Sequence, residues 1–338
     1  MGIKNLLKFL KEYPNLVKNT NIENYNGLKV AIDISILLYQ VVISIRNTGA
    51  DLTNNKGQIT SHILGLFNKT ITLLKRNIIP IYVFDGSPPD LKNNVLNNRK
   101  NNRLKAYEKM LNAKTEEERI KYFKRCVNIT SEQIIQSQEL LDLMGVPYII
   151  ANEEADSQCA YLSKKGLVDG VYTEDMDILT FGAKKIIRNL TSYKKNTIEI
   201  SLSEILEKLE LNYENFIDFC ILLGCDYCNG LNDIHPNIIF KYFKETKNID
   251  ATLQLLRNNG FRVPERIDYE RSKKYFLDCN SNKYIDFKNI NLRKPNIDDL
   301  EKKLVEDYSL IKSKIDKKLL FLQDFYDSKN DIKNVINL

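Results

Sequence analysis

Residues 79–85 read IPIYVFD, and residues 29–33 read KVAID. Each is a short apolar run that ends in an aspartate, a pattern typical of a buried strand in a parallel sheet. Similar runs occur at residues 146–151, 170–173 and 186–190. Longer segments with the apolar spacing of helices lie between these runs. The alternation predicts an α/β fold in which helices cover both faces of a parallel sheet.

Residues 88–130 interrupt this alternation. They begin with Pro88, Pro89 and Asp90, a helix-start signal. The sequence that follows favours helix but carries too little apolar surface for a core, so it predicts a helical arch that stands off the sheet.

From about residue 202 the chain is mostly helical in pattern. Two apolar helices are expected at 213–224 and 237–244, joined by the turn-rich stretch 225–236. We therefore divide the chain into a core (1–200, with the arch at 88–130), a helical module (201–260) and a C-terminal segment (261–338). That last segment is expected to pack on the core and to fray from about residue 327.

The charge of the chain is concentrated in the arch. Residues 90–125 hold eleven basic and five acidic side chains, a net charge of +6 that equals the net charge of the whole chain. Such a stretch indicates a polyanionic partner. The alternative is a solvated, charged helix without a partner.

Composition excludes several other classes of protein. No stretch approaches the roughly 20 apolar residues of a membrane span, and no secretory signal opens the chain. Six cysteines in 338 residues are too few for a disulfide scaffold, which favours an intracellular protein with reduced thiols. With only His62 and His235, a His-rich zinc or iron site is excluded.

Seven acids stand out because most of them follow a predicted strand. They are Asp33, Asp85, Glu154, Asp156, Asp175, Asp177 and Asp226. Taken singly, each is more typical of a turn or a helix cap. In one parallel sheet, however, the first six would meet at the edge where ligands bind. Oxygen ligands without imidazole or thiolate suit Mg²⁺ or Mn²⁺, and a pair of such ions is the usual apparatus for phosphodiester hydrolysis.

Cations on the arch complement these acids. Lys92 and Arg99 are seven residues apart and therefore face the same side of a helix, with Arg103 one turn further on. They are expected to meet a phosphate opposite the metal ions. Lys100, Lys105 and Lys109 are interpreted as solvent-exposed.

Several longer motifs resemble the flap endonucleases, a branch of the structure-specific 5′ nucleases. They are MGIKNLLKFL, KVAIDISILLYQ, TSHILG, IYVFDGSPPDLK, MGVPYI, EEADSQCA, TEDMDILTFG and CILLGCDYC. The resemblance runs from residue 1 to roughly 335. It implies a PIN-like nuclease core with a helical arch and a helix–two-turn–helix module at 201–260 that binds duplex DNA. It also implies metal-dependent cleavage of 5′ flaps and 5′ exonuclease activity.

The same resemblance assigns roles to individual residues. The seven acids would bind two Mg²⁺ ions, with Mn²⁺ able to substitute, and Lys92 and Arg99 would be the catalytic cations. Contacts to DNA are implied for Gly2, Tyr39, Arg46, Thr60, Arg103, Lys121, Lys124 and Arg125. Among them, Tyr39 would stack on a base beside the scissile phosphate.

This chain departs from the family pattern at three places. Asp156 stands where the family usually has Glu, and Asp233-Ile234-His235-Pro236-Asn237 replaces Gly-Ile-Gly-Pro-Lys. The second change predicts weaker binding of duplex DNA, because glycines that let backbone approach a phosphate and one positive charge are lost. In the C-terminal segment, Leu322, Phe325 and Tyr326 have the spacing of a sliding-clamp box, but Leu319 occupies its Gln position. The alternative there is an amphipathic helix that packs Leu319, Leu322 and Phe325 on the core.

The leading functional hypothesis is a Mg²⁺-dependent, structure-specific 5′ nuclease that acts on flapped or branched DNA in replication, repair or recombination. Two alternatives stay open: a nuclease of the same family that prefers nicks, gaps or junctions, and a catalytically silent DNA-binding scaffold. We expect a monomer without membrane association, located wherever DNA is replicated, in the nucleus or, for a viral protein, in the cytoplasm.

Overall fold

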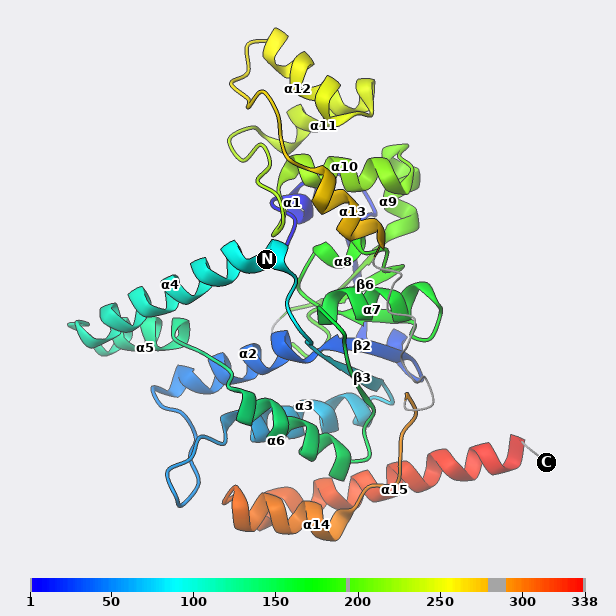
Figure 1. The fold of residues 1–338 in the computed structure, drawn as a ribbon. Coiled ribbons are helices and arrows are strands. Elements are labelled where there is room, and N and C mark those ends of the chain that lie inside the picture. Colours follow the sequence, from blue (N-terminus) through cyan, green and yellow to red (C-terminus); the bar gives the residue numbers. More distant parts are fainter. Residues whose placement is uncertain (1, 193–194, 279–289, 337–338) are drawn as a thin grey trace.

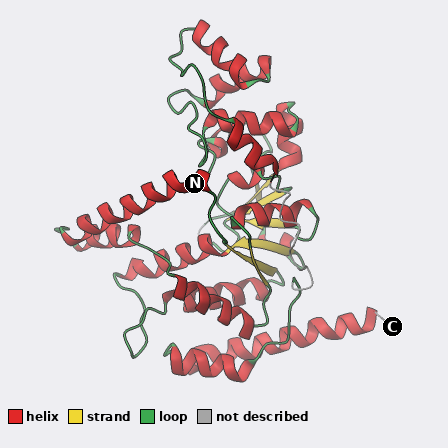
Figure 2. Ribbon diagram, viewed as in Figure 1, coloured by secondary structure: helices red, strands yellow, loops and turns green. Residues whose placement is uncertain are grey.

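The computed structural model describes residues 2–192, 195–278 and 290–336 (Figure 1). A seven-stranded sheet lies at its centre, in the order β1-β7-β6-β5-β2-β3-β4. Its strands are β1 (Lys18–Thr20), β2 (Lys29–Asp33), β3 (Ile79–Phe84), β4 (Tyr148–Ile150), β5 (Gly170–Tyr172), β6 (Lys185–Arg188) and β7 (Thr197–Ser201). The predicted α/β class is therefore confirmed, and Figure 2 shows the strands gathered between helices.

The sheet is mixed rather than wholly parallel, which corrects the prediction. β2 through β6 pair in parallel, as their sequence pattern indicated, but β7 pairs antiparallel with β6 and β1 pairs antiparallel with β7. The short connection between β6 and β7 leaves no room for the crossover that a parallel pairing needs. Sequence reasoning missed β1 because KNT is short and polar, and β7 because TIEIS mixes polar and apolar residues and is only partly buried.

Alternating side chains of the strands build two cores. On β3, Ile81 and Val83 face one core, while Tyr82 and Phe84 face the other. The first core is covered by α1 (Leu6–Lys11), α7 (Ala155–Lys164), α8 (Asp177–Thr180), α9 (Leu202–Leu209) and α10 (Tyr213–Leu223). The second is covered by α2 (Ile34–Ile45), α3 (Ser61–Lys75), α6 (Ser131–Leu143), α14 (Ile297–Lys302) and α15 (Lys312–Ile336). Both faces of the sheet are therefore buried.

The arch projects from one side of the molecule (Figure 1). After the short η3 (Asp90–Lys92) it consists of α4 (Asn93–Leu111) and α5 (Glu116–Arg125), and the Thr115 hydroxyl caps α5 by accepting a bond from Glu118 N. Arg46, which follows α2, donates to both carboxylate oxygens of Asp51 at 2.9 Å and to the Phe123 carbonyl at 2.9 Å. Its guanidinium also lies 4.2 Å from the centre of the Phe123 ring. Arg46 therefore fastens α5 to the core.

The helical module packs on the first core, on the side of the sheet away from the second core. α10 and α11 (Pro236–Thr246) correspond to the two expected helices, and α12 (Ile249–Asn258) follows. α13 (Glu270–Asp278) returns across α10, where Lys273 donates to Asp218 at 2.8 Å. The C-terminal segment thus contributes a helix beside the nuclease core before it crosses to the other face as α14 and α15 (Figure 1).

The tail expected to fray from about residue 327 is instead helical as far as Ile336. No Gly or Pro interrupts α15, and a helix that is already formed gains one hydrogen bond for each residue added. Ile315, Leu319 and Leu322 anchor the helix in the second core. Among the described helices, none combines the length and the apolarity needed to cross a membrane.

Candidate active site

Acids meet at the carboxyl edge of the parallel strands. Asp33 ends β2, Asp85 follows β3, Glu154 caps α7 after β4, and Asp175 lies beyond β5. Asp156 and Asp177 stand in the first turns of α7 and α8, and Asp226 comes from the loop between α10 and α11. β2 lies between β3 and β5, where the order of the strands reverses, the place where open α/β sheets bind ligands.

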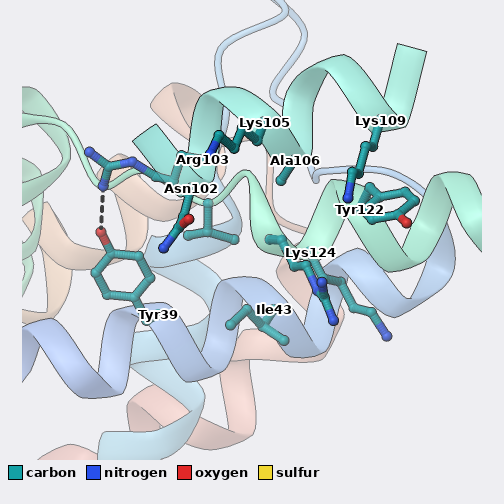
Figure 3. Close-up of a pocket in the computed structure, with 11 residues that line it drawn as sticks. Tyr39, Ile43, Asn102, Arg103, Lys105, Ala106, Lys109, Tyr122 and Lys124 are labelled. Atoms are coloured by element: carbon teal, nitrogen blue, oxygen red, sulfur yellow. Dashed lines mark hydrogen bonds between the residues drawn. The ribbon is translucent and has the colours of Figure 1, made fainter. Parts of the chain in front are cut away.

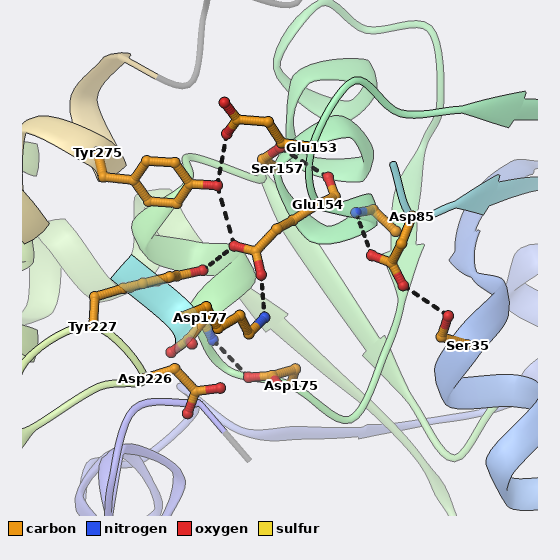
Figure 4. A network of polar contacts seen from close by, with 12 residues as sticks. Ser35, Asp85, Glu153, Glu154, Ser157, Asp175, Asp177, Asp226, Tyr227 and Tyr275 are labelled. Atoms are coloured by element: carbon orange, nitrogen blue, oxygen red, sulfur yellow. Dashed lines mark hydrogen bonds and ion pairs between the residues drawn. The ribbon is translucent and has the colours of Figure 1, made fainter. Parts of the chain in front are cut away.

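Hydrogen bonds tie the first of these acids to their neighbours. Asp33 accepts from the backbone of Ser35 at 2.7 Å and so caps α2. Asp85 accepts from the Ser35 hydroxyl at 2.7 Å and from Ala155 N at 2.9 Å (Figure 4). β2, β3 and α7 are thereby held together at the site.

The buried acids repel one another. Burial raises the pKa of Asp33 well above its usual value, and the charge of Asp85 raises it further. Burial likewise raises the pKa of Asp156, followed by the charges of Asp175 and Asp33. The pKa of Asp177 is raised by burial and then by Asp175 and Asp226. Acids from separate strands therefore form one electrostatic unit that favours cations.

Gly2 lies against this pocket. Its φ is +81°, and a Cβ on it would lie 1.8 Å from Asp175 Oδ1 and 2.9 Å from Asp177 N. Only glycine fits such a position, both for its backbone conformation and for its space. The chain therefore places residue 2 beside two of the predicted metal acids.

Two arch cations reach into the pocket. Lys92 pairs with Glu154, and Arg99 pairs with Asp226 at 2.7 Å. Burial is the largest single influence and lowers the pKa of Lys92, but the charge and hydrogen bond of Glu154, together with the charges of Asp156 and Asp226, raise the pKa overall. The predicted gateway cations thus face the predicted metal acids, each from the first turns of the arch.

The donor set fits a hard divalent ion. It consists of carboxylates, and Asp156 Oδ1 and Asp177 Oδ1 are buried without a hydrogen-bond partner in the described part of the chain. Within that same part, no three acids stand close enough together to enclose one ion as they are now oriented. Glu154 and Asp226 are engaged by Lys92 and Arg99, so the two cationic side chains must move aside before these two acids can hold a metal.

A cationic cavity of about 550 Å³ separates the arch from α2 (Figure 3). It is lined by Tyr39, Ile43, Asn102, Arg103, Lys105, Ala106, Lys109, Tyr122, Lys124, Arg125 and Val127. Arg103 donates to the Tyr39 hydroxyl at 3.3 Å. Lys109, Lys121 and Arg125 surround the Tyr122 ring at 5.6–5.8 Å from its centre. We call this space the arch cavity.

The structure gathers some of the predicted DNA contacts there and not others. Tyr39, Arg103, Lys124 and Arg125 line the arch cavity, and Lys121 lies beside it against Tyr122. Arg46 is only 9% exposed and is held by Asp51 and Phe123, while Thr60 is 2% exposed at the start of α3. Those two side chains are not presented to a ligand as they stand.

Sequence reasoning missed several side chains that line the arch cavity or contact the acids. Lys105 and Lys109 are exposed, as expected, but they also line the arch cavity together with Asn102 and Tyr122. Positions 102, 105, 106 and 109 share one helical face, which is the signal that could have found them. Beside the acids, the hydroxyls of Tyr227 and Tyr275 donate to Glu154, and nothing in the local sequence pattern marks Tyr275.

The loop at residues 233–237, which we call the hairpin, has an acid where the family has glycine and an asparagine where it has lysine. Asp233 is exposed between α10 and α11, and His235 Nδ1 accepts from Asn237 N at 3.4 Å as the cap of α11. Asn237 also donates to Glu12 after α1. Residues 232–237 contain neither Lys nor Arg.

The degenerate clamp box packs inward. Leu319 and Leu322 are 3% and 2% exposed in the second core, and Phe325 packs against it. This is the amphipathic-helix alternative raised from the sequence.

The family of the chain follows from comparison with known proteins. The model of the XPG N-terminal domain matches residues 1–106, and that of the XPG I-region matches residues 145–226. The chain belongs to the XPG family of structure-specific DNA nucleases. It is therefore a phosphodiester hydrolase.

Relatives of this XPG-family nuclease agree over most of its length. It is 38% identical to "Flap endonuclease 1" of Debaryomyces hansenii over 93% of this chain and 86% of that protein. The structure of flap endonuclease-1 from Methanococcus jannaschii matches with a TM-score of 0.71 and 34% identity, covering 93% of this chain and 97% of the other. The catalytic core of Rad2 in complex with DNA substrate matches equally well by TM-score, 0.71, at 26% identity, over 95% and 100% of the two chains.

A more distant match shows the fold alone. The junction-resolving enzyme GEN1, in complex with product DNA and a Mg²⁺ ion, is 18% identical with a TM-score of 0.57, over 91% of this chain and 73% of that one.

Proposed function

We propose that this XPG-family nuclease is a Mg²⁺-dependent 5′ flap endonuclease with 5′→3′ exonuclease activity on branched DNA in replication, repair or recombination. One observation supports it above all. The arch places two cations, Lys92 and Arg99, directly on the acids of the sheet edge, and its own cavity opens next to them. A site for phosphate chemistry and a site for a polyanionic strand are thus built from one segment of the chain.

Two Mg²⁺ ions, for which Mn²⁺ can substitute, would be held by Asp33, Asp85, Glu154, Asp156, Asp175, Asp177 and Asp226. When bound, the ions supply an activated water and stabilise charge on the attacking and leaving oxygens. The unpartnered oxygens of Asp156 and Asp177 favour these two acids as direct ligands. Because Asp156 is a methylene shorter than glutamate, its carboxylate reaches less far from α7.

Lys92 and Arg99 are proposed to be the catalytic cations. Each is paired with an acid that would hold a metal ion, so its ammonium or guanidinium group would be free to turn toward the pocket once that acid serves as a ligand. The freed cation can then bind the scissile phosphate and stabilise the charge that develops on it. Arg99 is 42% exposed, which leaves its side chain room to move.

The flap strand is proposed to pass the arch cavity. Tyr39 offers a ring on which a base can stack, and Arg103, Lys121, Lys124 and Arg125 offer charges to the backbone. Gly2 lets the N-terminal backbone approach the reacting phosphate closely. For Arg46 and Thr60 the support is weaker: we propose that Arg46 acts on DNA binding through the arch that it fastens, and that Thr60 marks the start of α3 beside the substrate.

The altered hairpin favours a second candidate within the family. Asp233 would repel a duplex phosphate, and Asn237 binds Glu12 rather than offering a charge. A changed contact with duplex DNA could shift the substrate preference of the nuclease from flaps to nicks, gaps or junctions. A clamp partner receives no support, because Leu322 of the box is buried.

Cleavage of a panel of labelled substrates separates these candidates. Double-flap, single-stranded, nicked, gapped and four-way-junction DNA would be incubated with Mg²⁺ or with chelator. The matched control for Asp177→Asn is Asp142→Asn, because Asp142 lies at the surface, where it pairs with Arg293 at 2.8 Å and accepts from the Tyr148 hydroxyl at 3.0 Å.

Mg²⁺-dependent incision near the flap base, lost in Asp177→Asn and kept in Asp142→Asn, is the expected result. Preference for nicks, gaps or junctions would replace the flap proposal with the second candidate. Binding without cleavage of any substrate would contradict both and favour a silent scaffold.

A further inference from the structure

An aromatic cluster closes the back of the acidic pocket. Phe181 follows α8, Tyr227 lies next to Asp226, and Tyr275 and Phe276 belong to α13. Tyr227 and Tyr275 have ring centres 5.0 Å apart, and Phe181 lies 5.8 Å from Tyr275 and 5.1 Å from Phe276. Edge-to-face contacts of this kind hold rings in place. The cluster therefore joins the segments that carry Asp177 and Asp226 to a helix far along the chain.

Two tyrosines of this cluster donate hydrogen bonds to Glu154. Lys92 engages Glu154 Oε1, whereas the hydroxyls of Tyr227 and Tyr275 both donate to Oε2, Tyr275 at 3.2 Å (Figure 4). Glu154 is 4% exposed, so these bonds are shielded from water. A buried carboxylate held by three donors has little freedom to rotate.

The Tyr275 hydroxyl has a second acceptor. Glu153 Oε2 lies 3.0 Å from it, so a single phenolic proton stands between two adjacent carboxylates. Ionised carboxylates can only accept, so the Tyr275 hydroxyl is the donor in both contacts.

α13 is itself firmly placed. Besides the Lys273–Asp218 pair at 2.8 Å, the Ser272 hydroxyl donates to the Tyr227 carbonyl at 3.1 Å. Tyr269, near the start of the helix, donates to Asp250 at 3.0 Å, away from the acids. Tyr275 can thus transmit a fixed position to Glu154 rather than follow its movements.

From this geometry we propose that Tyr275 is a positioning residue, whose hydroxyl bridges Glu153 and Glu154 and holds the Glu154 carboxylate in the orientation that binds a divalent cation. The inference rests on the acidic pocket of the proposed function. Hydrogen bonds that orient a metal-binding carboxylate are worth about 10–100-fold in metal affinity or activity. C-terminal helix α13 is then part of the metal site, although it supplies no ligand.

The test measures metal binding without DNA. Mn²⁺ would be titrated into the full chain and into Tyr275→Phe, and free Mn²⁺ would be followed by its electron paramagnetic resonance signal. Tyr275→Phe keeps the ring and its packing but removes the bridge. Tyr269→Phe is the matched control, because it removes a tyrosine hydroxyl bond to Asp250 at the residue that directly precedes the same helix.

Tyr275→Phe is expected to raise the Mn²⁺ dissociation constant about 10-fold, with an unchanged Tm in chelator. Its cleavage rate should approach that of the wild type when Mg²⁺ is saturating. Affinities within two-fold of each other, or an equal loss in Tyr269→Phe, would overturn the proposal.

Parallel cleavage assays keep this result separate from the proposed function. A wild-type protein that binds Mn²⁺ but cuts no flap would contradict the flap activity alone, and the comparison of variants would still decide the role of Tyr275. A wild-type protein that binds no Mn²⁺ would overturn the pocket and the role of Tyr275 together.

Discussion

The acidic pocket and the arch cavity differ in how they are built. The pocket stands on buried strand ends, and most of its acids have fixed partners, as Asp33 has in Ser35 and Glu154 in Tyr227. The arch cavity stands on two polar helices in which Ala106 is a rare buried residue. Rigid placement suits chemistry, which tolerates little displacement. An exposed cationic surface suits a strand whose sequence varies. The comparison predicts that damage to the pocket lowers the cleavage rate, whereas damage to the arch cavity lowers the affinity for DNA.

The largest effect is expected from Asp177→Asn. The change removes one charged ligand from the pocket at nearly constant volume, and lost stabilisation of several kcal/mol corresponds to a roughly 10²–10³-fold lower single-turnover rate. The dissociation constant for flap DNA should stay within about two-fold, because the arch is untouched. Single-turnover cleavage beside Asp142→Asn measures this. A normal rate in Asp177→Asn would remove this acid from the metal site.

A smaller effect is expected from the double variant Lys105→Gln/Lys109→Gln. Each lysine lines the arch cavity, so losing two contacts should weaken flap binding roughly 3- to 10-fold and lower the slope of log affinity against log salt by about 1.4. Lys314→Gln/Lys317→Gln, which removes equal charge from α15, is the control. Equal loss in both variants would show that net charge, and not the cavity, governs binding.

The pocket should also change stability with pH. Asp33, Asp156 and Asp177 have raised pKa values when folded, so the folded chain binds protons more readily than the unfolded one. Stability contributed by their protonation is present at low pH and is lost as the pH rises from 3.8 through the raised values. In chelator, Asp177→Asn should therefore be more stable than the wild type at pH 7, with a gap that shrinks toward pH 4.

His62 also changes the stability of the wild type with pH, but it does not affect the difference in stability between the wild type and Asp177→Asn. Burial lowers its pKa to about 4, so its protonation destabilises the folded chain as the pH falls from 6.5 toward 4, with the opposite sign. Thermal unfolding would be measured for both proteins across this pH range. Because both contain His62, its contribution cancels in the difference between their unfolding temperatures. A gap that grows at low pH would contradict the mutual repulsion of the acids.

The smallest effect is expected at the hairpin. Asp233→Gly with His235→Gly removes a repulsive charge and frees the backbone to approach a phosphate, which should tighten duplex binding by a few-fold. The single variant Asp233→Asn removes the charge without adding a glycine, so it separates the effect of charge from the effect of backbone freedom. The affinity for duplex DNA would be measured across a salt series. If neither variant changed this affinity, the hairpin would not contact DNA.

The two regions also differ in how far the sequence predicts them. Strand ends could be read from apolar runs followed by acids, so Asp33, Asp85 and Asp175 were expected at one edge. Strands β1 and β7 were missed because short, half-polar strands lack that pattern. The inward face of Lys105 and Lys109 depends on how α4 packs against α5, and the approach of Tyr275 to Glu154 depends on contacts 121 residues apart. Such placements follow from tertiary packing and not from local sequence.

The domain limits and the individual site roles remain predictions. Residues 1–200, 201–260 and 261–338 were separated by pattern, yet α13 of the last segment packs against α10 of the second and reaches the pocket of the first. A limit near residue 260 therefore cuts through one packed unit.

One pair of measurements tests the division of labour between pocket and arch most directly. The single-turnover rate at saturating protein and the dissociation constant for double-flap DNA would be measured for Asp177→Asn and for Lys105→Gln/Lys109→Gln. We expect opposite effects. Asp177→Asn should lower the single-turnover rate and keep the affinity for DNA. Lys105→Gln/Lys109→Gln should lower the affinity and keep the rate at saturating protein. If both variants lowered the same quantity, pocket and arch would act as one site, and the separate roles assigned to them would be wrong.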